Sequence, residues 1–266
     1  MKNNTLIIIP HGGTVIPEEL EPCTEVNDLT LFLESDCCAN QIFNFENSLG
    51  ILKTEISPLF IDLNKSYQSF AQRQRPGVIR RTTRNGINIF NNNYFPDDLA
   101  LANIFKRHYF PFFRTLKKII DTGEIDVVIE CHTMWPIGPS DSMDAGEPRP
   151  SFLINHVLDS ISGDIDCGHD KFMVSLKTEL HKSFNSAKAK NEIHDISISH
   201  EPLDGFIMRE IAYTGIPIIS LSVSRSLFLN EKYFNSDYLL VDELRIQEIK
   251  DKIWNSISIA SEVFKI

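Results

Sequence analysis

The sequence predicts an α/β protein built on a mostly parallel or mixed, twisted β-sheet with helices on both faces. Short runs rich in Ile and Val alternate along the chain with longer segments of helical periodicity. Several of these runs end abruptly in polar side chains, as buried strands do at the edge of a sheet. With 266 residues the chain is long enough for one large domain, and we expect a single domain over residues 1–266.

The expected strands are the aliphatic runs, taken here in chain order. They cover residues 6–9, 60–61, 127–129 and 218–219. The side chains that follow the first three runs include His11, Asp62, Glu130 and His132. Because ligands of such sheets bind beyond the carboxyl ends of the strands, we expect these polar side chains to converge there.

The expected helices lie between the strands, at approximately residues 28–47, 97–121, 169–189 and 239–264. The second is the clearest, because Asp97 opens it and Lys117 and Lys118 near its end complement the helix dipole. Pro111 is expected to kink this helix or to divide it. The last is expected to be an amphipathic helix that closes the fold.

Residues 73–95 form an arginine-rich segment, which we expect to be a long basic loop with a hairpin. Its arginines are Arg73, Arg75, Arg80, Arg81 and Arg84. One interpretation is an anion-binding lid, because guanidinium groups pair bidentately with carboxylates. The other is a solvated loop that balances nearby acidic residues.

The composition restricts the class of function. The formal net charge of −10 argues against a protein that coats nucleic-acid phosphates. The N-terminal aliphatic run is too short for a signal peptide or a membrane span. The odd number of cysteines, five, predicts no disulfide framework, so we expect a cytoplasmic protein. The G-x-S-x-G, P-loop and G-x-G-x-x-G motifs do not occur in the sequence.

Two histidines at strand ends indicate a metal site. Zinc in hydrolases commonly takes two histidines, one carboxylate and a water, and it activates that water as a nucleophile. His11 and His132 supply the imidazoles, and the carboxylate is open between Asp36, Asp62 and Glu130. The alternative is that each histidine is a structural residue held by hydrogen bonds.

Four segments resemble motifs of the N-formylglutamate amidohydrolase family, in the order in which the family carries them. PHGGTVIPEEL resembles its opening motif, FIDLNKS its Asp-Leu-Asn-Arg motif, and IECHTM its Asp-Cys-His-Ser-Met motif. EPLDGFIMREIAYTGIPIISLSVSR is similar to the late Gly-Gly-Tyr-Ile segment and final strand. The resemblance runs from residue 10 to about 225 and implies a fold like that of the zinc exopeptidases, the phosphorylase/hydrolase-like fold.

The resemblance also implies an activity and a set of site residues. The activity is zinc-dependent hydrolysis of a non-peptide carbon–nitrogen bond in a small N-acyl amino acid that bears a carboxylate. The zinc ligands would be His11, Asp36 and His132. Substrate contacts are expected from Asp62, Asn64, Lys65, Arg80, Arg84, Gly205 and Arg209. We expect no nucleic-acid or membrane partner, and the oligomeric state stays open.

The sequence departs from the family pattern at two positions that bear on catalysis. Lys65 stands where the family has Arg, which keeps the charge but loses the bidentate fork. Ser222 stands where the final strand of the family carries a Glu. A carboxylate commonly takes the proton from the attacking water in zinc hydrolases, and a serine at pH 7 cannot do so. The replacement base would be Glu130, Glu201 or Glu210, with Glu201 favoured because it lies in the loop beside the DGF segment.

Two functions therefore follow from the sequence. In the first, the chain is an active amidohydrolase in which another acid replaces the missing glutamate. In the second, it is a catalytically impaired member of the family that binds a small anionic ligand or a metal as a binding or sensing protein. Turnover of N-acyl amino acids distinguishes the two.

Overall fold

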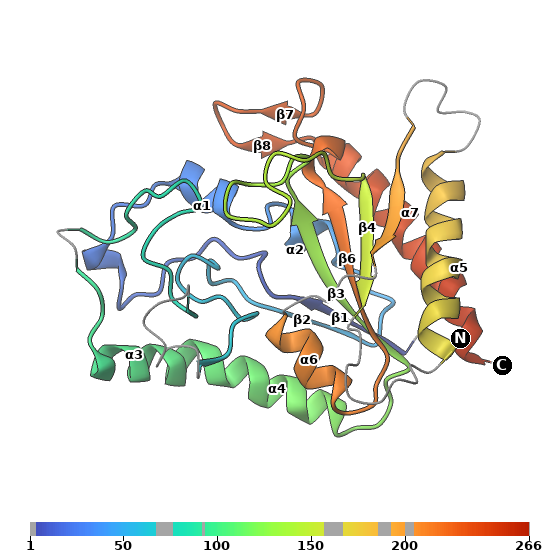
Figure 1. The fold of residues 1–266 in the computed structure, drawn as a ribbon, viewed down its shortest axis with the longest axis horizontal. Coiled ribbons are helices and arrows are strands. Elements are labelled where there is room, and N and C mark those ends of the chain that lie inside the picture. The colour runs from blue at the N-terminus through green and yellow to red at the C-terminus, as the bar shows by residue number, and fades with distance from the viewer. Residues whose placement is uncertain are drawn as a thin grey trace.

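A six-stranded sheet forms the centre of the protein. The computed structural model describes residues 4–67, 77–91, 94–156, 167–185, 193–199 and 205–265. The strands are β1 (Thr5–Ile9), β2 (Gly50–Lys53), β3 (Val127–Met134), β4 (Phe152–His156), β5 (Ile196–Ser199) and β6 (Ile218–Ser224). Their order is β2-β1-β3-β6-β4-β5, and all neighbours run parallel except β4 and β6 (Figure 1). The expected α/β class with a mostly parallel sheet is therefore confirmed.

Helices cover both faces of this sheet (Figure 1). They are α1 (Asp28–Glu34), α2 (Ala39–Ile42), α3 (Asp98–Ile104), α4 (Phe110–Ile120), α5 (Cys167–Phe184), α6 (Phe206–Ala212) and α7 (Glu243–Ala260). The helices α2, α5 and α7 pack on one face, and α3, α4 and α6 pack on the other. A short hairpin of β7 (Phe234–Asn235) and β8 (Leu240–Val241) precedes α7.

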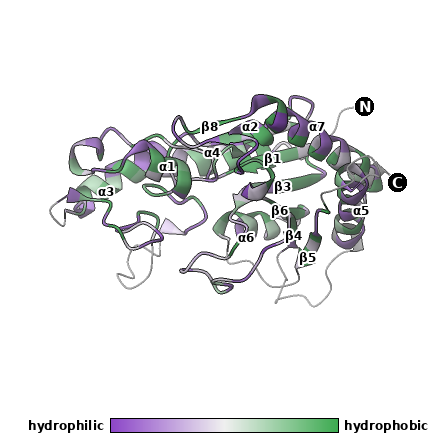
Figure 2. Ribbon diagram, turned by 90° about the horizontal axis from the view of Figure 1, so that it is seen from above, coloured by the Kyte–Doolittle hydropathy of each residue, from purple (hydrophilic) through white to green (hydrophobic). Residues whose placement is uncertain are grey.

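The alternation of side chains along the strands creates two hydrophobic cores. In β1, Ile7 and Ile9 belong to the core beneath α5 and α7, whereas Leu6 and Ile8 belong to the core above α3 and α4. Every residue of β1 is buried, and the central strands β1 and β3 are green in the hydropathy view (Figure 2). Burial on both faces explains why this strand is a continuous aliphatic run.

One expected strand is wrong, and three strands were not expected. Residues 60–61 form no strand: they belong to a turn in which the N–H groups of Phe60 and Ile61 both donate to the Ser57 carbonyl. Their apolar character reflects complete burial, with exposures of 0% and 1%, and not an extended backbone. The strands β2, β4 and β5 were not among the expected strands; none of them is as long as β3.

The expected helices are found, with two interruptions. Residues 28–47 divide into α1 and α2, because the backbone becomes extended at Ser35 and Cys38 adopts a left-handed φ of 62° at the N-terminus of α2. Residues 97–121 stay helical, but Phe105–Tyr109 form a π-helical turn directly before Pro111. The segment is thus divided into α3 and α4, and Pro111 lies in the first turn of α4, where a helix tolerates proline. The helix α6 was not expected.

The arginine-rich segment contains the expected hairpin within its described residues, 77–91 and 94–95. Thr82 and Asn88 form an antiparallel bridge, and Gly86 adopts a positive φ of 79° at the turn between them. Arg73 and Arg75 lie outside the described residues.

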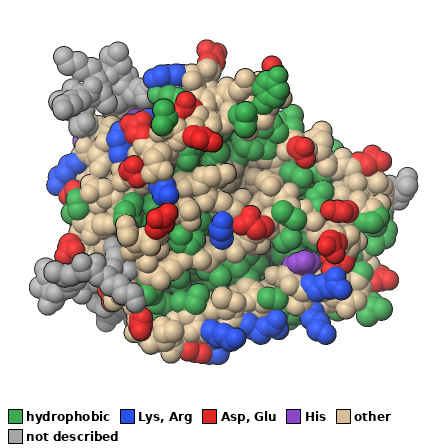
Figure 3. Space-filling view, turned by 180° about the vertical axis from the view of Figure 1, so that it is seen from behind, with side chains coloured by type: hydrophobic (Ala, Val, Ile, Leu, Met, Phe, Trp, Pro, Cys, Tyr) green, Lys and Arg blue, Asp and Glu red, His purple; other side chains and the backbone are tan. Residues whose placement is uncertain are grey.

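Charged side chains of both signs share the face of the molecule drawn in Figure 3. Basic side chains gather along its lower edge, where α3 and α4 run (Figures 1 and 3). Among the described helices, none is long and apolar enough to cross a bilayer.

Candidate metal centre and anion pocket

The strands β1 and β3 bring two imidazoles to one carboxylate. His11 lies two residues beyond the end of β1, and His132 lies within β3. The Asp36 Oδ2 atom lies 2.7 Å from His132 Nδ1 and 3.8 Å from His11 Nδ1. The ligand atoms of the three residues all lie within 4.8 Å of one another, which is close enough for a single cation to contact all three. We call His11, Asp36 and His132 the ligand cluster.

The second nitrogen of each imidazole is held by another carboxylate. His11 Nε2 lies 2.8 Å from Asp62 Oδ1, and His132 Nε2 lies 2.8 Å from Glu130 Oε1. Glu130 reaches His132 because residues two apart on a strand share one face of the sheet. A carboxylate behind each imidazole fixes the tautomer and orientation of the ring, as is usual for histidines that bind a metal.

Asn64 connects the two supporting carboxylates. Its backbone N–H donates to Asp62 Oδ1 at 2.9 Å, and its side-chain Nδ2 donates to Glu130 Oε1. The Asn64 carbonyl in turn accepts a hydrogen bond from the N–H of Phe206, the first residue of α6. The turn that follows residues 60–61 therefore places Asp62 and Asn64 correctly for the site, although it does so without the expected strand.

Three residues of the site, Asp36, Asp62 and His132, have shifted pKa values. Burial opposes ionisation of Asp36 and Asp62, but the hydrogen bonds and charges of the imidazoles outweigh it, and the pKa of Asp62 falls to about 2. Burial also opposes protonation of His132, but hydrogen bonds to Asp36 and Glu130 raise its pKa to about 10. Asp36 and Asp62 therefore stay ionised at neutral pH and make the cluster attractive to a cation.

Arg225 is a site residue that the sequence analysis did not single out. Its guanidinium is buried, donates to the carbonyls of Leu33 and Ser35 at 2.8 and 2.5 Å, and lies 3.6 Å from Asp36 Oδ1. One oxygen of Asp36 thus faces Arg225 while the other faces the imidazoles. Its place in the sequence could have indicated this role, because Arg225 directly follows a buried strand and a buried cation needs a counter-charge nearby.

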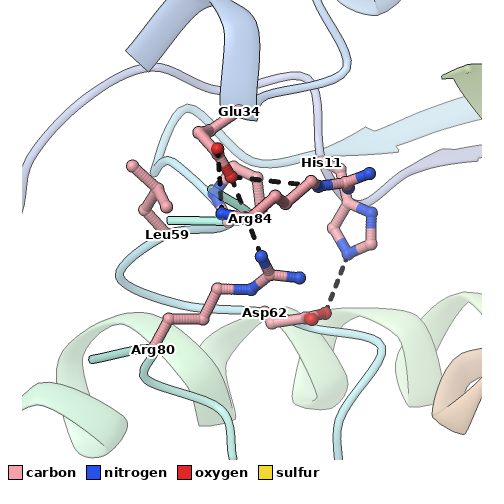
Figure 4. Close-up of a pocket in the computed structure, with 7 residues that line it drawn as sticks. His11, Glu34, Leu59, Asp62, Arg80 and Arg84 are labelled. Carbon is pink, nitrogen blue, oxygen red and sulfur yellow. Dashed lines mark hydrogen bonds and ion pairs between the residues drawn. The ribbon is translucent and has the colours of Figure 1, made fainter. Parts of the chain in front are cut away.

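A pocket opens beside His11 and Asp62 (Figure 4). Its other lining residues include Glu34 at the end of α1, Leu59, and the hairpin residues Arg80 and Arg84. We call Glu34, Arg80 and Arg84 the anion pocket. The guanidinium of Arg80 lies between Glu34 and Asp62 in the close-up view, so the cationic side chains border directly on the ligand cluster (Figure 4).

The remaining candidates lie in several places. The Lys65 carbonyl accepts a hydrogen bond from the hydroxyl of Tyr109 at 2.8 Å, while the Lys65 charge contributes to the low pKa of Asp62. Gly205 directly precedes α6, on which Arg209 and Glu210 are both exposed. Neither Arg209 nor Glu210 is among the residues found to line the pocket. Glu201 lies outside the described residues.

Glu130 and Ser222 bear on the search for a general base. Glu130 is 1% exposed, and its Oε1 atom is engaged by His132 and Asn64 on the side of the imidazole opposite Asp36. This geometry differs from the expected role as a base, because a base must reach the attacking water. Ser222 pairs in register with His132 on the neighbouring strand β6, so a serine stands beside this ligand.

Comparison with solved structures extends the similarity over nearly the whole chain. The N-formylglutamate amidohydrolase from Ralstonia eutropha JMP134 shares 14% identity with a TM-score of 0.69, covering 99% of this chain and 95% of that one. A gene product of Agrobacterium tumefaciens shares 15% identity with a TM-score of 0.61, covering 97% and 91%. These similarities establish a shared fold. No curated protein matches the chain. The family model described as N-formylglutamate amidohydrolase matches residues 4–229, and the chain therefore belongs to this family.

Proposed function

We propose that this protein is a zinc-dependent amidohydrolase that cleaves the amide bond of a small N-acyl amino acid. The observation that carries the proposal is the paired arrangement of the imidazoles. Both Nδ1 atoms face Asp36, while both Nε2 atoms are held by the carboxylates of Asp62 and Glu130. Membership of an amidohydrolase family supports hydrolysis of an amide bond.

The chemistry of the ligand cluster fits zinc. Two imidazole nitrogens and one carboxylate oxygen are a common donor set for catalytic zinc and leave a coordination position for water or substrate. Bound zinc supplies Lewis acidity, which polarises a carbonyl and favours ionisation of water. Asp62 and Glu130 hold the imidazoles in the tautomer that keeps each Nδ1 available, and Arg225 keeps one oxygen of Asp36 turned toward them.

The anion pocket accounts for the amino-acid end of the substrate. Arg80 and Arg84 line the same pocket as His11, so a substrate carboxylate that pairs with either guanidinium lies close to the ligand cluster. Their side chains are 19% and 27% exposed, which makes them accessible to a ligand from solvent. A substrate held in this way presents its amide toward the proposed zinc.

Glu201 remains our proposed general base. Glu130 is committed to His132 and Asn64, and the β6 position beside His132 is Ser222. If the assignment is right, the Glu201→Gln variant loses turnover by at least about 100-fold while it still binds zinc, because general-base catalysis contributes on that scale. Turnover at the wild-type rate would remove the assignment.

The serine at position 222 also supports a second candidate function. Without a carboxylate at position 222 to act as a base, the protein would bind an N-acyl amino acid or a metal and act as a binding or sensing protein. Tight binding of N-acyl amino acids by the zinc-loaded protein, with no release of free amine, would favour this function over hydrolysis.

The deciding experiment combines metal analysis with a substrate panel. Metal content is measured on purified wild-type, His11→Ala and His132→Ala proteins, and each is incubated with N-formyl and N-acetyl amino acids. We expect the wild type to bind about one zinc ion, as three-ligand sites do, and to release free amine. Both variants should lose zinc and activity. A wild-type protein that binds no divalent metal would overturn the proposed metal centre.

A further inference from the structure

Residues 35–40 lead from the end of α1 into α2 and include Asp36 of the ligand cluster. We call them the connecting segment. Its backbone is extended at Ser35 and left-handed at Cys38, where φ is 62°. A positive φ costs free energy in a residue other than glycine, so it persists only where the surrounding contacts hold it. The contacts of the connecting segment therefore indicate what its conformation serves.

Thr133 joins the connecting segment to β3, directly beside the ligand His132. It is 3% exposed, and its hydroxyl donates to the Cys37 carbonyl at 3.1 Å. Adjacent residues of a strand point to opposite faces of the sheet. His132 therefore contacts Asp36 on one face of β3, while Thr133 points to the other face and contacts the next residue, Cys37. Two neighbouring residues of β3 thus hold two neighbouring residues of the connecting segment.

Two further hydrogen bonds join the connecting segment to the loop that carries the other imidazole. The backbone N–H of Asp36 donates to the His11 carbonyl at 2.8 Å. Asn40, on α2, donates through Nδ2 to the Gly12 carbonyl at 3.0 Å. A Cβ at Gly12 would lie 2.5 Å from Asn40 Oδ1, so the glycine allows this close approach. The connecting segment therefore links the loop after β1 to β3.

These links bear on metal binding because a metal site needs its ligands within about 0.5 Å of the productive geometry. The members of the ligand cluster come from three separate parts of the chain, namely the loop after β1, the connecting segment and β3. Their spacing depends on the bonds between these parts. Thr133 and Asn40 are uncharged, so the loss of either hydrogen bond shifts the ligands without changing the charge of the site.

We infer that Thr133 and Asn40 are positioning residues, which hold the ligand cluster at a fixed spacing through the backbone of the connecting segment. The inference rests on the proposed function, since it concerns the ligands of the proposed metal centre. Thr133 should have the larger effect of the two. When Asn40 is lost, the loop after β1 keeps its other hydrogen bond, from the N–H of Asp36 to the His11 carbonyl.

The test measures the Kd for zinc of the folded protein by competition with a chelating dye. Thr133→Val keeps the branched shape but cannot donate to the Cys37 carbonyl, and we expect the Kd to rise about tenfold. Thr133→Ser keeps the hydroxyl and should stay within about twofold of the wild type. Asn40→Leu should raise the Kd about threefold, the effect of one neutral hydrogen bond.

The double variant tests whether both residues act through the connecting segment. Thr133→Val already frees this segment from β3, so adding Asn40→Leu should raise the Kd by less than about twofold further. If the two effects multiplied instead, the hydrogen bonds would act independently, and the inference of a shared link would be overturned.

Thr24→Val is the matched control. The Thr24 hydroxyl also donates to a carbonyl distant in the sequence, that of Ile89, at 2.5 Å, but neither residue belongs to the ligand cluster or its supporting carboxylates. This variant should keep the Kd within about twofold of the wild type. A thermal unfolding midpoint for each variant shows that folded proteins are compared. If Thr133→Val does not fold, Asn40→Leu against Thr24→Val decides alone.

Failure of the inference and failure of the proposed function give different results. A wild type that binds no zinc removes the proposed metal centre and the inference with it. A wild type that binds zinc no more tightly than Thr133→Val overturns the inference alone. The same holds if Thr133→Ser binds zinc as weakly as Thr133→Val, because the hydroxyl would then not be the cause, or if Thr24→Val raises the Kd equally.

Discussion

His11 belongs to the ligand cluster and also lines the anion pocket, but the ion pairs within the two sites differ in length. Asp36 approaches His132 to 2.7 Å, and the supporting carboxylates approach their imidazoles to 2.8 Å. The ion pairs of the anion pocket are 3.7 and 3.8 Å long, and two of the atoms involved have no hydrogen-bond partner among the described residues.

The difference follows from the elements that carry the residues. The imidazoles lie at or beside the central strands, whose backbones are fixed by pairing on both sides. The arginines lie on a hairpin outside the sheet, and the glutamate lies at the end of a short helix. Rigid elements suit a metal, which requires fixed ligand geometry, whereas a looser surface suits a ligand whose side chain varies. The following changes test this contrast.

Removing the charge of Asp36 should have the largest effect. The Asp36→Asn variant keeps the shape of the side chain but leaves the buried guanidinium of Arg225 without its neighbouring carboxylate and leaves the His132 imidazole with Glu130 alone. We expect the free energy of unfolding to fall by about 3 kcal/mol, as is typical when one partner of a buried ion pair is removed, and zinc binding to be lost. Urea denaturation of the apoprotein measures the first effect.

Asp144→Asn provides the comparison for that experiment. Asp144 makes a two-bond ion pair with Arg149, but its side chain is 43% exposed. A surface pair of this kind contributes about 1 kcal/mol or less. If the two variants lowered the free energy of unfolding equally, the ion pairs of Asp36 would contribute no more to stability than a surface ion pair does.

Changes to the supporting carboxylates, Asp62 and Glu130, should have the next largest effect, and we expect it on zinc affinity and not on the stability of the fold. Asp62→Asn and Glu130→Gln remove the charge behind His11 and His132 while the ligands themselves stay. We expect zinc affinity to fall by about 10- to 100-fold in each variant, the usual effect of such partners. Competition with a chelating dye measures the change. A fall in zinc affinity of less than about threefold would show that neither carboxylate supports metal binding.

The sequence predicts those site residues whose position depends on neighbouring residues, and it misses those whose position depends on contacts far away in the chain. His11 and His132 follow aliphatic runs that are buried on both faces, so their convergence is predictable, although His132 lies within β3, which continues to Met134, and not at the expected strand end. Asp62 is predicted to lie with them, but the run before it is a buried turn, because burial alone does not distinguish a turn from a strand. The role of Arg225 depends on carbonyls at Leu33 and Ser35, far away in the sequence, and no local pattern encodes that contact.

The segment between α1 and α2 and the contacts of the arginine hairpin were less predictable, because they too depend on the tertiary structure. The first helix ends at Ser35, which has an extended backbone, and the second begins after Cys38, which adopts a positive φ that non-glycine residues seldom adopt and propensity does not indicate. Glu34 reaches the anion pocket only because α1 stops just before this interruption. The arginine hairpin was expected from composition, whereas its ion pairs with Glu34 required the tertiary structure.

Binding of zinc to the metal-free protein, prepared by treatment with a chelator, should release a proton. Hydrogen bonds to Asp36 and Glu130 outweigh the effect of burial and raise the pKa of His132 to about 10, so the ring is protonated at neutral pH and must lose a proton from Nδ1 to bind a metal. Zinc affinity should therefore rise by about tenfold per pH unit between pH 6 and 8. Calorimetry in buffers of different ionisation enthalpy measures the proton count. An affinity independent of pH would contradict the assignment of His132 as a ligand.

Changing the arginines should have the smallest effect, and one confined to substrate binding. Arg80→Lys and Arg84→Lys keep the charge but lose the planar fork, and both side chains are partly exposed. We expect KM for an N-acyl amino acid to rise by about fivefold, with kcat changed by less than twofold, since the interaction is made equally in the ground and transition states. The unfolding free energy should change by less than about 1 kcal/mol, as for other exposed pairs. A fall in kcat equal to the rise in KM would place the arginines at the reacting group, and the anion pocket would then be as constrained as the ligand cluster.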